Sequence, residues 1–101
     1  MLDMTYKMKK LIRYRNNPRG VSFEELKSLL ESFGFEVKNY SGGSHFSVSH
    51  NKYNVIGAME PNTIPSKKQN MMQVYVSRAI KWIEKVLEIQ EAEEAEKNEE
   101  K

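Results

Sequence analysis

"VSFEELKSLLESFGFEV" (Val21–Val37) changes its hydrophobic period at Gly34, and this change decides the fold class. Before the glycine, five hydrophobic residues recur at the spacing of one helix face: Phe23, Leu26, Leu29, Leu30 and Phe33. After the glycine, hydrophobic and charged residues alternate, as is typical of a half-buried strand. A helix that passes directly into a strand predicts an α+β fold.

The ends of this helix are also marked in the sequence, and we predict it over residues 22–33. Ser22 is followed three positions later by Glu25, which is the pattern of a capping box. Val21 and Leu26 occupy the two positions of a hydrophobic staple around that cap. Gly34 stands where a left-handed residue commonly ends a helix, because glycine has no Cβ to clash.

Three short antiparallel strands are predicted after this helix. The first covers residues 35–38, and the second follows a Ser-Gly-Gly turn signal at residues 41–43. The third is predicted over residues 55–59, and residues 60–70 are predicted to form a loop because they contain two prolines. Short connections favour a meander of these strands.

Alternation along the second strand separates its side chains into two sets. Phe46 and Val48 mark the buried side, together with Ser44. The polar side carries His45, Ser47 and Ser49. His50 falls on the side opposite to His45, roughly 16 Å away along the strand. The two histidines are therefore not expected to act on one phosphate or to share a metal ion.

Two further helices are predicted at the ends of the chain. The first covers residues 3–16, with Met4, Met8 and Leu11 on its apolar face and Ile12 beside them. The last begins near Met71, and its apolar stripe ends at Leu87. We predict one domain over residues 1–87, with the helices on one face of the sheet, followed by an acidic helical or disordered tail over residues 88–101.

Charge is distributed unevenly over the 101 residues. Residues 88–101 contain seven Glu and two Lys, a balance of −5, while the net charge of the whole chain is +2. Residues 1–87 therefore carry +7, which favours a polyanionic partner such as RNA. Plain solubility is the alternative explanation of this charge.

Composition excludes several classes of protein. The chain contains no cysteine, so it has neither a disulfide framework nor a thiolate metal site. No apolar run approaches the roughly 20 residues that span a bilayer, and the N-terminus lacks the apolar segment of a signal peptide. We expect a cytoplasmic protein without a membrane partner. No sequence motif for a metal, a nucleotide or another cofactor occurs, and none is expected.

His45 is the leading candidate for chemistry, because histidine serves as a general acid or base near neutral pH without a cofactor. RNA supplies its own nucleophile, the 2′-hydroxyl group. The glycines before His45 would let a phosphate approach the backbone, and Ser44 would donate a hydrogen bond to it. An inert surface histidine is the alternative, and these residues alone do not decide between the two.

Four segments in order resemble the HicA family, the toxin half of a bacterial toxin–antitoxin pair. They are "VSFEELKSLLESFGFEV", "GGSH", "TIP" and "VYVSRAIKWIEKVLE", and the resemblance covers about residues 19–87. The resemblance implies a fold like that of double-stranded-RNA-binding domains, in the order α-β-β-β-α, with an extra N-terminal helix here. It also implies a cofactor-independent ribonuclease that cleaves mRNA and is neutralised by an antitoxin of the HicB type.

The resemblance assigns roles to particular residues. The family's catalytic histidine corresponds to His45, in the sequence Gly43-Ser44-His45. Their chemistry, rather than the resemblance, suggests that Lys67 and Lys68 would hold the RNA backbone and that Gly43 and Ser44 would position the phosphate. Ser47 and Ser49 stand where basic residues are frequent in the family, so charge is missing beside His45. A non-catalytic RNA-binding module and a protein-interaction domain are therefore the alternative functions.

Overall fold

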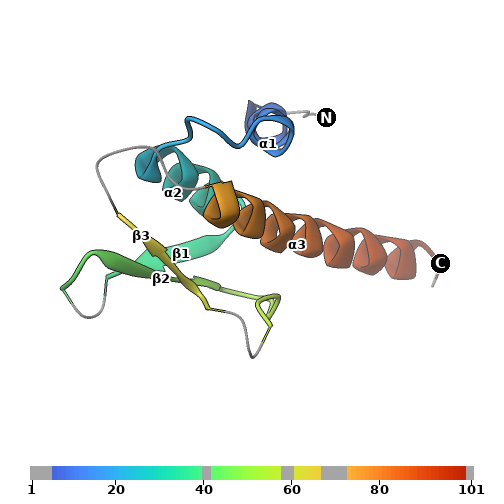
Figure 1. The fold of residues 1–101 in the computed structure, drawn as a ribbon. Coiled ribbons are helices and arrows are strands. Elements are labelled where there is room, and N and C mark those ends of the chain that lie inside the picture. The colour runs from blue at the N-terminus through green and yellow to red at the C-terminus, as the bar shows by residue number, and fades with distance from the viewer. Residues whose placement is uncertain (1–5, 40–41, 58–60, 67–72, 100–101) are drawn as a thin grey trace.

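The computed structural model describes residues 6–39, 42–57, 61–66 and 73–99. Within these ranges the chain forms three α-helices and one three-stranded antiparallel sheet (Figure 1). The elements follow in the order α1 (Tyr6–Asn16), α2 (Phe23–Ser32), β1 (Phe35–Lys38), β2 (His45–His50), β3 (Thr63–Pro65) and α3 (Gln73–Glu99). The predicted α+β class is confirmed.

The molecule is layered, with the sheet on one side of α2 and α3 and with α1 on the other side (Figure 1). α1 contacts both α2 and α3. The core fills the space between these layers, and its fully buried residues come from α2, α3 and the sheet, as Leu26, Ile83 and Val48 illustrate. The other face of the sheet is left uncovered by the helices.

Helix α2 begins and ends as its sequence predicts. Ser22 Oγ accepts a hydrogen bond from the backbone N–H of Glu25 at 3.1 Å, and Glu25 Oε1 accepts one from the backbone N–H of Ser22 at 3.0 Å. This reciprocal capping box satisfies two backbone donors that the first turn leaves unpaired. After the helix, Gly34 adopts φ +94°, which lets the chain turn directly into β1.

The prediction of the third strand is wrong. Residues 55–57 form no strand, and residues 58–60 lie outside the described part of the chain. The third strand is β3, inside the segment that was predicted to be a loop, and Ile64 pairs with Phe46 on the buried face. Ser66 N–H donates a hydrogen bond to Ser44 O at 2.7 Å. Because successive residues of a strand bond alternately to a given neighbour, the backbone nitrogen of Pro65 points away from β2, where no N–H is needed. Proline is therefore tolerated on this edge strand.

Helix α1 buries a partly different face from the one predicted. Leu11 and Tyr14 are buried and Met8 is half-buried, but Ile12 is 37% exposed. The predicted start at residue 3 lies outside the described residues, as does Met4. Ile12 is exposed because α1 packs on α2 and α3 through the side that carries Leu11 and Tyr14.

Helix α3 buries the predicted stripe and then continues beyond it. Val76, Ile80 and Ile83 are buried, and Leu87 is half-buried. The acidic segment after Leu87 remains helical to Glu99, with its side chains exposed from Glu88 to Lys97. No helix among the described residues is both long and apolar enough to cross a membrane.

Candidate functional site

The strand register defines the uncovered face of the sheet, because directly paired residues point to the same side. Glu36 pairs with Ser49, Lys38 with Ser47, and His45 with Pro65. These residues, together with Thr63, lie on what we call the open face, which points away from α2 and α3. The opposite face carries the pairs Phe35–His50, Val37–Val48 and Phe46–Ile64. The predicted division of β2 into two sides is confirmed for residues 45–50, whereas Ser44, predicted on the buried side, precedes the strand and is exposed.

His45 is the first residue of β2, and its side chain is exposed. No hydrogen bond to another described residue engages its ring. Phe46, the next residue, packs on Phe23 of α2, with 4.8 Å between ring centroids. The strand is therefore anchored to the core immediately beside His45, while the imidazole itself is open to a ligand.

The turn before His45 is held by Asn39, which sequence reasoning did not single out. Asn39 Nδ2 donates a hydrogen bond to Gly43 O at 2.6 Å, and Gly42 N–H donates to Asn39 Oδ1 at 2.6 Å. Gly42 adopts φ +80°, and an added Cβ would meet nothing within 4 Å. The turn therefore presents open space beside its backbone. An asparagine before a Gly-Gly pair is a recognisable signal, since Asn side chains commonly close such turns.

Ser44 is fixed from the other side, by the end of β3. Its carbonyl oxygen accepts hydrogen bonds from Ser66 N–H at 2.7 Å and from Ser66 Oγ at 3.0 Å. The Ser44 side chain is exposed beside His45. Lys67 and Lys68, the proposed phosphate contacts, lie outside the described residues, but they follow Ser66 directly in the sequence.

Lys38 supplies a positive charge that sequence reasoning did not place on this face. It pairs directly with Ser47, so it stands diagonally across the sheet from His45, a distance that a long side chain can reach. Lys38 Nζ lies 3.6 Å from Glu36 Oε1, and both side chains are about half exposed, at 56% and 49%. Such an exposed pair contributes little to stability and leaves the ammonium group accessible to a phosphate.

His50 has a structural role at the far end of β2. Its Nδ1 accepts hydrogen bonds from the backbone N–H groups of Lys52 at 3.0 Å and Tyr53 at 3.1 Å. Because Nδ1 is thus an acceptor, the proton of the neutral ring is on Nε2, which donates to Phe33 O at 2.9 Å. Both ring nitrogens of His50 therefore form hydrogen bonds within the protein.

A pocket of about 520 Å³ lies around this end of β2, lined by residues 48–57 and Asn62. It is separated from His45 by most of the length of the strand. Among the described residues, no group of three or more His, Asp or Glu side chains is placed to hold a metal ion.

The chain was compared with models of protein families, with curated proteins and with solved structures, and it matches none of them. The likeness to the HicA family therefore rests on the short segments of sequence described above.

Proposed function

We propose that the protein is a cofactor-independent endoribonuclease that cleaves mRNA, and that it is the toxin component of a toxin–antitoxin pair. The observation that carries this proposal is the position of His45. Its exposed ring stands on the open face, directly after a turn with space for a phosphate. That turn is fixed by Asn39 on one side and by Ser66 on the other.

The chemistry requires one base and no metal. Neutral His45 accepts the proton of a ribose 2′-hydroxyl, and the 2′-oxygen forms a bond to the adjacent phosphorus. The bond from phosphorus to the 5′-oxygen breaks, and that oxygen takes a proton from water. The products are a 2′,3′-cyclic phosphate and a free 5′-hydroxyl. The imidazolium then returns its proton to the solvent.

Neighbouring groups would position the phosphate for this reaction. Gly42 leaves room for its approach, and the exposed Ser44 side chain, next to His45 in the sequence, would donate a hydrogen bond to it. Lys38 would offset part of the negative charge that develops on the phosphate oxygens. Lys67 and Lys68, which follow Ser66 in the sequence, would hold the RNA backbone.

Expression in bacterial cells tests the toxin role. We expect the wild-type chain, produced without an antitoxin, to arrest growth, and we expect His45→Ala to permit growth at the same protein level. The physical reason is that alanine removes the only proposed base while leaving an exposed position of β2 otherwise intact. Unimpaired growth with well-expressed wild-type protein would contradict the toxin role.

An antitoxin protein of the HicB type is the partner that this proposal implies. Covering the open face would block both His45 and Lys38, which is the simplest form of inhibition. Coexpression of a neighbouring reading frame should therefore restore growth, and the two proteins should copurify.

A non-catalytic RNA-binding module is the second candidate, and a specific observation favours it. Ser47 and Ser49 share the open face with His45 and bring no charge to it, while Lys38 is close to Glu36. Salt-sensitive binding of RNA without any cleavage by the wild-type protein would establish this alternative.

A further inference from the structure

The outward side of α1 carries four residues that we call the α1 outer face: Tyr6, Lys9, Lys10 and Arg13. Leu11 and Tyr14 turn toward the core, so the helical spacing directs Lys9 and Arg13, one turn apart, toward the solvent. Tyr6 is 76% exposed, more than any other large hydrophobic side chain that the structure describes. Lys10 Nζ lies 5.4 Å from the centroid of the Tyr6 ring.

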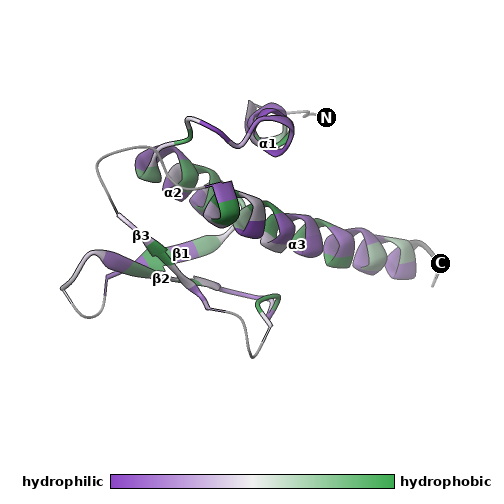
Figure 2. Cartoon of the chain, in the orientation of Figure 1, coloured by the Kyte–Doolittle hydropathy of each residue, from purple (hydrophilic) through white to green (hydrophobic). Residues whose placement is uncertain are grey.

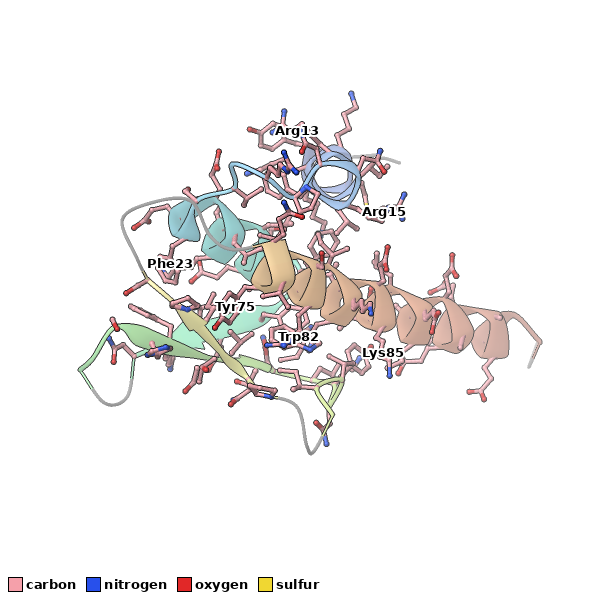
Figure 3. The ribbon with its side chains drawn as sticks, in the orientation of Figure 1. Arg13, Arg15, Phe23, Tyr75, Trp82 and Lys85 are labelled. Carbon is pink, nitrogen blue, oxygen red and sulfur yellow. The ribbon has the colours of Figure 1, made fainter. Side chains whose placement is uncertain are left out.

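The cations of the α1 outer face have no carboxylate partner among the described residues. In contrast, the two other basic residues of the helix are engaged inside the molecule. Lys7 Nζ donates a hydrogen bond to Ser32 O at 3.1 Å, and Arg15 Nη1 pairs with Glu84 Oε2 at 3.0 Å. The helix thus uses part of its charge to dock onto α2 and α3. Lys9 and Arg13 are exposed and Lys10 is half-buried, and Lys10 and Arg13 also lie over the Tyr14 ring, at 5.9 and 5.5 Å from its centroid. Figure 3 shows Arg13 and Arg15 at this outer layer.

We propose that the α1 outer face binds single-stranded nucleic acid. An unpaired base stacks on Tyr6, and Lys9, Lys10 and Arg13 contact the flanking phosphates. Proteins that bind single strands without strong sequence preference combine an exposed aromatic ring with cations that follow the backbone. The spacing of one helical turn between Lys9 and Arg13, about 5.4 Å along the axis, suits two points on one strand.

A membrane surface fits this helix less well. A helix that binds a bilayer inserts an apolar face between the lipids. The apolar residues Leu11 and Tyr14 of α1 are already buried against the protein, and most of the α1 ribbon has the colour of hydrophilic residues (Figure 2). A nucleic acid would use both features of this surface, because its bases stack on an exposed aromatic ring and its phosphates bind cations.

This surface is distinct from the proposed catalytic site. α1 lies on the far side of α2 and α3 from the sheet (Figure 1), and the register places His45 on the open face of that sheet, which points away from the helices. The inference does not rest on RNA cleavage, because it concerns binding alone. If both proposals hold, α1 anchors a second part of a long RNA substrate while His45 acts on another.

Binding of a fluorescent single-stranded RNA to the full-length His45→Ala protein tests the stacking. Its affinity is expected to fall roughly tenfold with Tyr6→Ala, since stacking on an aromatic ring contributes strongly to single-strand binding. Tyr6→Phe is the matched control, because it keeps the ring, and it should bind as the parent protein does. Circular dichroism verifies that each variant is folded.

The salt dependence of the same binding tests the charges. Replacing both Lys9 and Arg13 by Gln should lower the slope of log affinity against log salt by about 1.4, or about 0.7 for each cation. Replacing Lys85 and Lys97 of α3 by Gln is the control. It removes the same charge from another surface and should leave the slope unchanged.

Two results would overturn the proposal. One is an affinity that Tyr6→Ala leaves unaltered, together with a slope that Lys9 and Arg13 do not influence. The other is binding to phosphatidylserine vesicles, but not to RNA, that depends on Tyr6. Because cleavage is not measured in these experiments, a failure of the catalytic proposal and a failure of this one are distinguishable.

Discussion

Gly34 satisfies two requirements at one position. Its φ of +94° is a conformation that residues with a Cβ rarely adopt. In addition, a Cβ at this position would lie 2.7 Å from Nε2 of His50. The ring cannot easily move away, because three hydrogen bonds hold it and it packs edge-on against Phe35 at 4.7 Å between centroids.

Replacing Gly34 by alanine is therefore expected to destabilise the protein by about 3 kcal/mol. Left-handed backbone strain contributes about 1 kcal/mol or more, and displacement of the His50 ring adds the loss of hydrogen bonds. Gly20→Ala is the matched control, because Gly20 has φ +76° but nothing within 4 Å of an added Cβ. Urea unfolding of both variants measures the difference, and equal losses of stability would show that the His50 contact is unimportant.

At this scale the sequence predicted one requirement of Gly34 and missed the other. Its place after a helical stripe indicates a left-handed residue, because that signal is local. The approach of His50 depends on the pairing of Phe35 with His50, which residues far apart in the sequence determine together. For the same reason, His50 was predicted only to lie on the side of the strand opposite to His45, and its role in holding a turn was missed.

The turn between β1 and β2 is the element that presents His45. Asn39 bonds to the backbone at both Gly42 and Gly43, so a single side chain closes the loop that ends at the candidate site. The bonds are exposed to solvent, and each therefore contributes modestly to stability. Their main role is to hold the turn in a fixed position relative to His45.

Asn39→Ala is expected to lower the rate of RNA cleavage about tenfold while reducing stability by only about 1 kcal/mol, because misplaced groups weaken catalysis more than they weaken the fold. Asn54→Ala, in the loop after β2, is the control, because it removes the same side chain from an exposed position away from the turn before His45. Cleavage rates and thermal unfolding of both variants provide the measurement. A loss of activity that is equal in the two variants would refute a specific role of Asn39.

The helices and strands differ in how well the sequence predicts them. Helix α2 and strand β1 were predictable because caps and hydrophobic period agree there. β3 was missed because three residues with a proline present no alternation to detect, and their strand geometry comes from hydrogen bonds to β2. Val55 is buried without belonging to a strand, so hydrophobicity alone led to the wrong segment.

The two surfaces proposed to bind RNA lie on opposite sides of the helical layer of the molecule. The open face carries His45 and Lys38, and α1 carries exposed cations beside Tyr6. The sequence predicted that His45 would lie on the uncovered side of the sheet, because strand alternation determines this. It did not predict that α1 would lie too far round the molecule to supply charge to His45, since that depends on how the layers stack (Figure 1).

The central claim is that His45 is the base of an RNA-cleaving site, and the rate of RNA cleavage by the purified protein tests it most directly. His45→Ala should reduce this rate at least about 100-fold, the usual contribution of a general base. Ser49→Ala, an exposed position on the same strand and the same face, should leave the rate within about twofold, because it lies roughly 13 Å from His45. If His45→Ala cleaves RNA as fast as the wild-type protein does, the catalytic assignment is wrong.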